Sequence, residues 1–203
     1  MNYALIGCGR ISPNHLAAAQ ANNLNIVGLC DINVEAMNDK AVKFNLQSVK
    51  QYFDYKEMLS EQKPSLVSIC TESGKHEEIA LYCIEQGIHV IIEKPIALSV
   101  EGANRIIKAA KEYGVKVSAC HQNRFNKSVV KIREAVEEER FGKMFYGTAH
   151  IRWNRGKQYY DQAPWRGTWE QDGGALMNQC IHNIDLLRWM MGNEITEVFA
   201  YTD

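Results

Sequence analysis

The sequence predicts an α/β fold in which a doubly wound parallel sheet is followed by part of an α+β domain with an open, mostly antiparallel sheet. Three observations support this prediction. Short apolar runs alternate with helical stretches over the first 120 residues, a glycine-rich turn joins the first run to the first helical stretch, and the pattern changes after about residue 122. Strands that alternate with helices form βαβ units, whose strands are parallel.

The alternating elements of the first part follow in chain order. The predicted strands are residues 3–6, 26–30, 66–70, 89–92 and 115–119. Val90-Ile91-Ile92 is a short continuous apolar run, which is typical of a strand that is buried on both faces. The predicted helices are residues 11–21, 34–44, 55–61, 77–86 and 100–113. Gly87 and Gly114 follow helical stretches and precede strands, where a helix C-terminal glycine is expected.

The second part has a different pattern. Residues 127–140 predict an amphipathic helix, residues 145–153 alternate like an antiparallel strand, and Gly173-Gly174 open a final helix through Met191. Residues 195–201 predict one more strand. Because a two-stranded unit is marginal alone, we expect Asp203 to be a truncation point.

Composition excludes several classes of protein. The chain is 46% hydrophobic and 23% charged, with a formal net charge of -1, and its acidic and basic residues are interspersed. Such a chain carries no electrostatic footprint for nucleic acid and no polybasic patch for a membrane. No signal peptide is visible, and no apolar stretch approaches the roughly 18 residues of a membrane span. The six cysteines form no C-x-x-C pair, so we predict reduced thiols and a cytoplasmic location.

A glycine-rich turn between the first strand and the first helix predicts a nucleotide site. It reads Gly7-Cys8-Gly9-Arg10-Ile11-Ser12, the G-x-G-x-x-G pattern with serine in the third position. Gly7 allows the tight turn, and Gly9 lets the backbone approach a pyrophosphate at the helix N-terminus. This context predicts a Rossmann domain that binds a dinucleotide.

Asp31 ends the second predicted strand, where an acid accepts hydrogen bonds from ribose hydroxyls and repels a 2′-phosphate. It could also cap the helix that begins near Val34. We therefore predict NAD rather than NADP as the cofactor, and place residues 1–122 in the dinucleotide-binding domain. Residues 123–203 are then the first part of a substrate-binding and oligomerisation domain.

Polar residues follow the later strands, where open α/β sheets bind their ligands. Glu93-Lys94-Pro95 closes the apolar run at residues 89–92, and the alternative is a solvated loop. Asn178, His182 and Asp185 share one face of the final helix by their spacing. His182 would otherwise be a core histidine, with Asp185 orienting it. Two plausible ligands cannot complete a tetrahedral site, so we predict no metal.

Together these residues resemble the Gfo/Idh/MocA oxidoreductase family, which includes glucose–fructose oxidoreductase and inositol 2-dehydrogenase. The resemblance covers essentially all 203 residues. It rests on Gly7-x-Gly9, Glu93-Lys94-Pro95, Trp165-Arg166, and Gly173-Gly174 followed by His182 and Asp185. It implies a C-terminal domain with an open, largely antiparallel sheet, through which we expect homodimers or homotetramers.

A narrower resemblance is to the bacterial UDP-N-acetyl-glucosaminuronate 3-dehydrogenases of lipopolysaccharide sugar synthesis. It is carried by residues 121–126, by residues 165–169, and by Asn178-Gln179 before His182. Many sugar and inositol dehydrogenases have Asp four residues before the histidine, whereas this sequence has Asn178. Asparagine is neither an acid nor a base, so proton transfer falls to Lys94 or His182.

The resemblance implies NAD-dependent oxidation of a secondary hydroxyl of a sugar, C3 of a UDP-N-acetyl-hexuronic acid in cell-surface polysaccharide synthesis. We favour His182 as the base and Lys94 as the group that holds the hydroxyl oxygen, with the reverse left open. Predicted cofactor contacts are Gly7, Gly9, Arg10, Ile11, Ser12, Asp31, Thr71, His76, Glu93, Lys94, Gln122, Trp165 and Arg166. Predicted substrate contacts are Lys94, Arg124, Arg152, Tyr160, Asn178, His182 and Asp185. The alternatives are another sugar or polyol dehydrogenase of the family, or a non-catalytic NAD-binding sensor.

Overall fold

A six-stranded parallel sheet organises the first 119 residues in the computed structural model, which describes residues 1–192 and 194–201. The strands are β1 (Asn2–Ile6), β2 (Asn25–Cys30), β3 (Lys50–Tyr52), β4 (Leu66–Ile69), β5 (His89–Ile92) and β6 (Val117–Ala119). Their order is β3-β2-β1-β4-β5-β6, and every neighbouring pair is parallel. The strand order reverses between β1 and β4, so a ligand crevice is expected beyond the carboxyl ends of these two strands.

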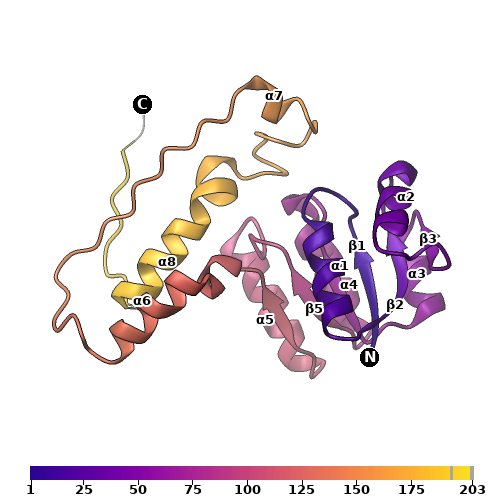
Figure 1. Cartoon of the computed structure of the whole chain (residues 1–203), viewed down its shortest axis with the longest axis horizontal. Helices are drawn as coiled ribbons and strands as arrows, with labels where there is room; N and C mark the ends of the chain where they lie inside the picture. Colours follow the sequence, from indigo (N-terminus) through magenta and orange to yellow (C-terminus); the bar gives the residue numbers. More distant parts are fainter. Residues whose placement is uncertain (193, 202–203) are drawn as a thin grey trace.

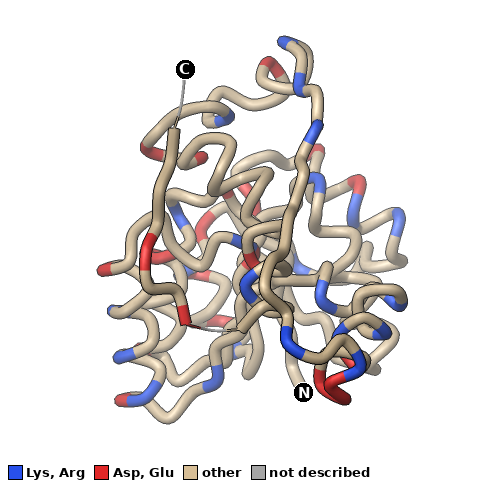
Figure 2. Tube along the Cα trace, turned by 90° about the vertical axis from the view of Figure 1, so that its left-hand side faces the viewer, with Lys and Arg blue, Asp and Glu red and all other residues tan. Residues whose placement is uncertain are grey.

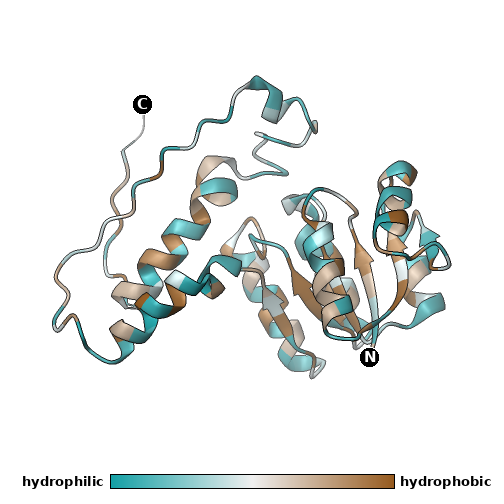
Figure 3. Cartoon of the chain, in the orientation of Figure 1, coloured by the Kyte–Doolittle hydropathy of each residue, from teal (hydrophilic) through white to brown (hydrophobic). Residues whose placement is uncertain are grey.

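Helices cover both faces of the sheet, which confirms the doubly wound α/β prediction (Figure 1). They are α1 (Ser12–Ala21), α2 (Val34–Lys43), α3 (Tyr55–Gln62), α4 (His76–Glu85) and α5 (Val100–Glu112). Leu16 of α1 and Met37 of α2 are buried in one apolar core, and Ile79 of α4 and Ile106 of α5 are buried in the other. The strands β1, β2 and β5 between these cores are mostly hydrophobic in Figure 3.

Side-chain caps explain where three of these helices begin. The side chains of Asn33, Asp54 and Ser99 accept hydrogen bonds from the backbone in the first turns of α2, α3 and α5. Such caps satisfy backbone N–H groups that have no partner within the helix. The strand β3 was missed from the sequence because Lys50-Gln51-Tyr52 has no apolar run and pairs only at the edge of the sheet.

The remaining elements lie beside the sheet in Figure 1, with α6 and α8 next to each other. They are the 3-10 turn η2 (Gln122–Phe125), α6 (Lys127–Glu137), the short α7 (Lys157–Tyr160), the π-helical turn η3 (Leu176–Cys180) and α8 (Ile181–Met191). Arg133 of α6 stacks over the Trp189 ring of α8 and donates to the Trp189 carbonyl. The predicted final helix through Met191 is confirmed, with a π-helical turn inside it. The domain division at residue 122 stays a prediction.

The two strands predicted in the second part are wrong. Residues 145–153 and 195–201 run as irregular chain, without a hydrogen-bonded ladder in the described structure. An alternating pattern favours a strand, but the strand forms only where a neighbour supplies the other half of the ladder.

Lys and Arg are interspersed with Asp and Glu along the trace in Figure 2, as the net charge implied. In the described part of the chain, no helix is both long and apolar enough to span a membrane.

Candidate active site

A cavity of about 1240 Å³ lies beyond the carboxyl ends of the strands, where the sheet topology predicts a ligand. Its wall combines the glycine turn after β1, the ends of β2, β4 and β5, and residues of the second part of the chain. Gly9, Asp31 and Thr71 are among its lining residues, and so are Lys94, Asn178 and His182. The cavity is large enough for a dinucleotide together with a further ligand.

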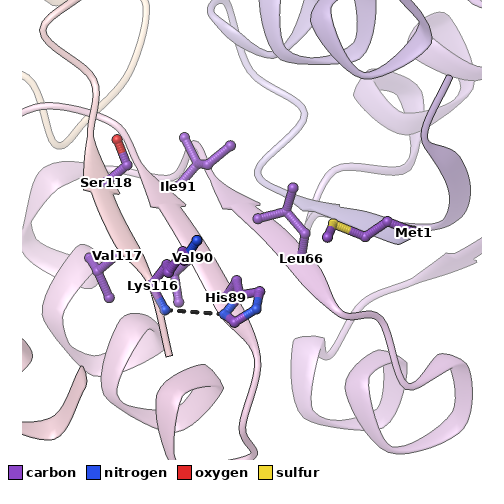
Figure 4. A pocket seen from close by; sticks show the side chains of 8 residues that line it. All are labelled: Met1, Leu66, His89, Val90, Ile91, Lys116, Val117 and Ser118. Carbon is purple, nitrogen blue, oxygen red and sulfur yellow. Dashed lines mark hydrogen bonds between the residues drawn. The ribbon is translucent and has the colours of Figure 1, made fainter. Parts of the chain in front are cut away.

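A second hollow of about 540 Å³ lies near the amino ends of β4 and β5, away from these residues (Figure 4). Its lining is mostly apolar, with Leu66, Val90 and Val117 among its residues. The one hydrogen bond drawn there joins the Lys116 backbone N–H to His89 Nδ1 at 3.1 Å. Because ligands bind at the carboxyl ends of parallel strands, we assign the site to the larger cavity.

The glycine turn has the geometry of a phosphate-binding loop. Gly7 has a φ of +92°, and a Cβ there would lie 2.5 Å from the Cys70 carbonyl carbon, so the position accepts only glycine. A Cβ at Gly9 would meet nothing within 4 Å, which leaves open space on the cavity wall. No side chain caps the N-terminus of α1, but the Ser12 and Asn14 N–H groups donate to the Gly9 and Ile11 carbonyls and Pro13 has no N–H, so an anion here would be bound by the backbone of the turn before the helix. These observations fit a dinucleotide pyrophosphate.

Ser12 packs against the inner side of the glycine turn. Its side chain is fully buried, and its hydroxyl donates to the Gly9 carbonyl at 2.7 Å. It therefore takes the packing role of the third glycine, and it does not line the cavity.

Asp31 fastens the turn to the end of β2. Its Oδ2 accepts from the Cys8 backbone N–H at 2.6 Å, and its Oδ1 accepts from the Asn33 N–H at 2.8 Å. The cap of α2 is Asn33, whose side chain accepts from Ala36, so the alternative role of Asp31 as that cap is wrong. The carboxylate lines the cavity, where a ribose diol can donate to it.

We expect Asp31→Asn to lower NAD affinity about tenfold, because a hydrogen bond to a charged acceptor contributes about 1.5–3 kcal/mol. The NAD-to-NADP preference should fall as well, since the repulsion of a 2′-phosphate is lost. Equilibrium titration of both dinucleotides measures the two effects. Asp39→Asn, at an exposed position of α2, is the control. An unchanged preference in Asp31→Asn would contradict the assigned role.

Lys94 and Asn178 meet across the cavity although 84 positions separate them. Lys94 Nζ donates to the Asn178 backbone oxygen at 2.7 Å and approaches its Oδ1 at 3.3 Å. Asn178 lies in the π-helical turn η3, a distortion that is frequent at functional sites. His182, one turn further along, is 8% exposed and leaves its Nδ1 without a partner in the described structure. An amine and an imidazole with free hydrogen-bonding capacity thus face one cavity.

The electrostatics of this pair favour proton transfer near neutral pH. Burial lowers the pKa of Lys94, against the opposing charges of Glu93 and Asp172. Burial, and then the neighbouring charges of Lys94 and His121, lower the pKa of His182. Lowered pKa values increase the fraction of each group that is unprotonated at neutral pH, which is the form that can accept a proton, and such perturbed groups are typical of active sites.

Asp185 does not orient His182 as the helical spacing suggested. Its carboxylate accepts from both Nε and a terminal nitrogen of Arg124, with 2.7 Å for the Nε bond, and lies 3.6 Å from His121 Nδ1. Arg124 also stacks over the Trp189 ring. Arg124 and Asp185 therefore hold the start of the second part against α8, and neither lines the cavity. Their role as substrate contacts stays a prediction.

The cavity collects most of the other predicted contacts. The predicted residues in its wall are Gly7, Gly9, Arg10, Ile11, Asp31, Thr71, His76, Glu93, Lys94, Gln122, Trp165, Arg166, Asn178 and His182. Arg152 and Tyr160 are not among its lining residues, whereas their neighbours Arg155 and Tyr159 are. The His76 imidazole lies 2.7 Å from the Pro95 carbonyl and 3.2 Å from the Thr71 carbonyl, so its polar atoms are already engaged.

The sequence-based prediction missed Asp172 and the stacking of two arginines on Tyr159, although Arg155 and Arg166 themselves are candidates for carboxylate or pyrophosphate contacts. The Asp172 carboxylate is 2% exposed and accepts hydrogen bonds from the Gly167 N–H and the Asn178 side chain. It thereby orients Asn178, the residue that Lys94 contacts. Its place directly before Gly173-Gly174 was the available signal. Arg155 and Arg166 stack over the Tyr159 ring, and each keeps a buried Nε without a partner in the described structure. Such guanidinium groups suit an anionic ligand.

One trio among the described residues has the composition of a metal site. Ligand atoms of His15, Glu93 and Cys120 lie within 4.8 Å of one another. However, both ring nitrogens of His15 are already hydrogen-bonded, and burial raises the pKa of Cys120 to about 12, which keeps the thiol protonated. This donor set does not suit a cation. The predicted absence of a metal stays a prediction.

Comparison with known proteins supports this reading of the cavity. Residues 1–121 match the model of the GFO/IDH/MocA oxidoreductase family with an NAD-binding Rossmann fold, and residues 129–203 match the GFO/IDH/MocA C-terminal domain. The myo-inositol 2-dehydrogenase of Thermotoga maritima is 28% identical over 98% of this chain and 58% of its own length. The chain spans a little over half the length of the curated relatives it matches.

Two solved structures are similar over nearly the whole chain. The WlbA dehydrogenase of Bordetella pertussis, in complex with NADH and UDP-GlcNAcA, is 37% identical with a TM-score of 0.87, over 94% of this chain and 58% of its own. The WlbA dehydrogenase of Chromobacterium violaceum, with the same two ligands, is 36% identical with a TM-score of 0.88, over 95% of this chain and 55% of its own.

Proposed function

This chain belongs to the GFO/IDH/MocA oxidoreductase family, and we propose that it forms the NAD-binding and catalytic part of a sugar-nucleotide 3-dehydrogenase. The substrate we propose is a UDP-N-acetyl-hexuronic acid, oxidised at its C3 hydroxyl in cell-surface polysaccharide synthesis. The observation that carries the proposal is the Lys94–Asn178 contact beside His182 in the cavity that also holds the glycine turn. The two similar enzymes crystallised with UDP-GlcNAcA support the substrate class.

His182 and Lys94 have different roles in this reaction. Bound NAD supplies the hydride acceptor. His182, whose pKa is lowered by burial and by Lys94, takes the hydroxyl proton in its neutral form. Lys94, fixed by the Asn178 carbonyl, donates a hydrogen bond to the same hydroxyl oxygen and orients it. The roles of Lys94 and His182 can also be reversed, and the pH profiles described in the Discussion separate the two cases.

The arginines of the second part suit the charges of this substrate. Arg155 and Arg166 line the cavity, and a guanidinium binds a carboxylate or pyrophosphate through paired hydrogen bonds. Their stacking on Tyr159 holds the two planes in place before a ligand binds. A neutral polyol offers no anion to these groups. The expected homo-oligomer and the cytoplasmic location stay predictions.

A comparison of two substrates tests the proposal. We expect the kcat/KM for NADH formation with UDP-GlcNAcA to exceed that with myo-inositol by about 100-fold or more, since paired charge-assisted hydrogen bonds contribute several kcal/mol. Arg155→Met should remove much of this preference, whereas Arg188→Met, at an exposed position outside the cavity wall, should retain it. Faster oxidation of myo-inositol by the wild type would instead favour an inositol dehydrogenase. That is the activity in the name of the Thermotoga maritima relative at 28% identity. Binding of NAD without turnover of either compound would favour a sensor.

A further inference from the structure

Behind the cavity wall, a histidine of α1 is joined to the strand that carries Lys94. His15 Nε2 lies 2.9 Å from Glu93 Oε1, and His15 Nδ1 lies 3.1 Å from Ser68 Oγ on β4. The His15 and Glu93 side chains are each 10% exposed. Glu93 lines the cavity, whereas His15 is not one of its lining residues. The imidazole therefore supports the wall from outside the site.

The carboxylate of Glu93 also contacts the backbone of Lys94. Its second oxygen accepts from the Lys94 backbone N–H at 3.2 Å, so one carboxylate joins α1 to the start of the Glu93-Lys94-Pro95 turn. Burial raises the pKa of Glu93, but the hydrogen bond and charge of His15, together with Lys94, outweigh this effect and leave the pKa lowered. The carboxylate is thus held in its charged form, and its charge in turn acts on Lys94 and His182.

We propose that His15 is a positioning residue for the reaction, which holds the Glu93 carboxylate and through it the backbone and charge environment of Lys94. This inference rests on the proposed function for its catalytic consequence, but the His15–Glu93–Lys94 linkage can be tested without a substrate. The same α1 also presents its uncapped N-terminus to the cavity, so one helix supports both the phosphate loop and the reacting amine.

Three substitutions at His15 separate its two contacts. In His15→Gln the amide nitrogen takes the place of Nε2 and can still donate to Glu93. In His15→Asn the shorter amide takes the place of Nδ1 and reaches only Ser68. His15→Met fills similar space and makes neither bond. Ser68→Ala removes the partner on the other side of the ring, and Ser68 is 1% exposed and outside the cavity wall.

Turnover gives the first readout. We expect kcat to fall about tenfold or more in His15→Met and His15→Asn, because small displacements of a positioned group are costly. His15→Gln and Ser68→Ala should stay within about threefold of the wild type, and the NAD Kd and sugar KM should change little in all four. Wild-type kcat in His15→Met would overturn the inference. An equal loss in all three His15 variants would also overturn it, as packing alone would then explain the effect.

Lysine labelling gives a readout that does not depend on the substrate. Competitive acetylation followed by mass spectrometry compares Lys94 with the exposed Lys108 in each protein. We expect the relative reactivity of Lys94 to change about threefold or more in His15→Met and His15→Asn, and to stay near the wild-type value in His15→Gln. Unchanged Lys94 reactivity in all variants would overturn the inference. Absence of wild-type turnover with UDP-GlcNAcA would instead contradict the proposed substrate. The labelling of Lys94 would then still test whether His15 positions it.

Discussion

Lys94→Met and His182→Asn should each lower kcat by about 100-fold or more while NAD still binds. The expected size is that of a lost general acid–base group. Both side chains line the cavity, and NAD is expected to make its main contacts with the glycine turn and Asp31. Steady-state kinetics measure the loss of turnover, and dinucleotide titration measures the binding that is retained.

The pH profile assigns the proton acceptor. Burial and the charges of Lys94 and His121 place the pKa of His182 below its ordinary value of 6.5. A base must be unprotonated, so kcat/KM should rise with pH through this lowered pKa and then level. His182→Asn should remove this acid limb, and Lys94→Met should keep it. The opposite pattern would make Lys94 the base.

Matched controls exclude effects of charge and shape alone. Lys108→Met and His150→Asn change exposed residues outside the cavity wall and should leave kcat near the wild-type value. Near-normal turnover in Lys94→Met or His182→Asn would remove that residue from the proposed chemistry.

Gly7→Ala should lower the free energy of unfolding by about 3 kcal/mol or more. Two costs add: a side chain at a positive φ costs about 1–2 kcal/mol, and overpacking costs about 1–3 kcal/mol. The added Cβ would lie 2.5 Å from the Cys70 carbonyl carbon, and this contact is with backbone, which cannot yield easily. Chemical denaturation of the variant and the wild type measures the difference.

Two other glycines serve as controls for Gly7→Ala. Gly87 has a φ of +74°, and a Cβ added there would meet nothing within 4 Å, so Gly87→Ala tests backbone strain alone and should cost about 1 kcal/mol. Gly9→Ala meets no neighbour and should leave stability nearly unchanged, yet lower NAD affinity about tenfold or more where the pyrophosphate passes. Equal stability of Gly7→Ala and Gly87→Ala would contradict the role assigned to the close approach.

The sequence predicted those features that depend on local patterns. The buried strands β1, β2, β4 and β5 are recognisable because apolar residues dominate each of them, and the glycine turn is recognisable because backbone geometry demands glycine at Gly7. Residues 145–153 show the limit of such patterns. Their alternation is that of a strand, but no neighbouring segment in the described structure completes a ladder with them.

Contacts that depend on tertiary packing could not be predicted in this way. Helical spacing suggested that Asp185 orients His182, whereas Arg124, 61 positions away, is its partner. His15 and Glu93 are 78 positions apart, and neither residue signals the other locally. The sequence therefore identified Lys94 and His182 as candidates, and the folded chain adds the Asn178, Asp172 and Glu93 contacts that orient Lys94.

Isotope transfer tests the central claim most directly. UDP-GlcNAcA that carries deuterium at C3 of the sugar would be incubated with the protein and NAD, and the reduced nicotinamide would be examined by NMR. The proposed reaction predicts one deuterium on the nicotinamide ring and a slower hydride-transfer step than with the unlabelled sugar. NADH formed without deuterium, or no NADH at all, would contradict the oxidation of this hydroxyl.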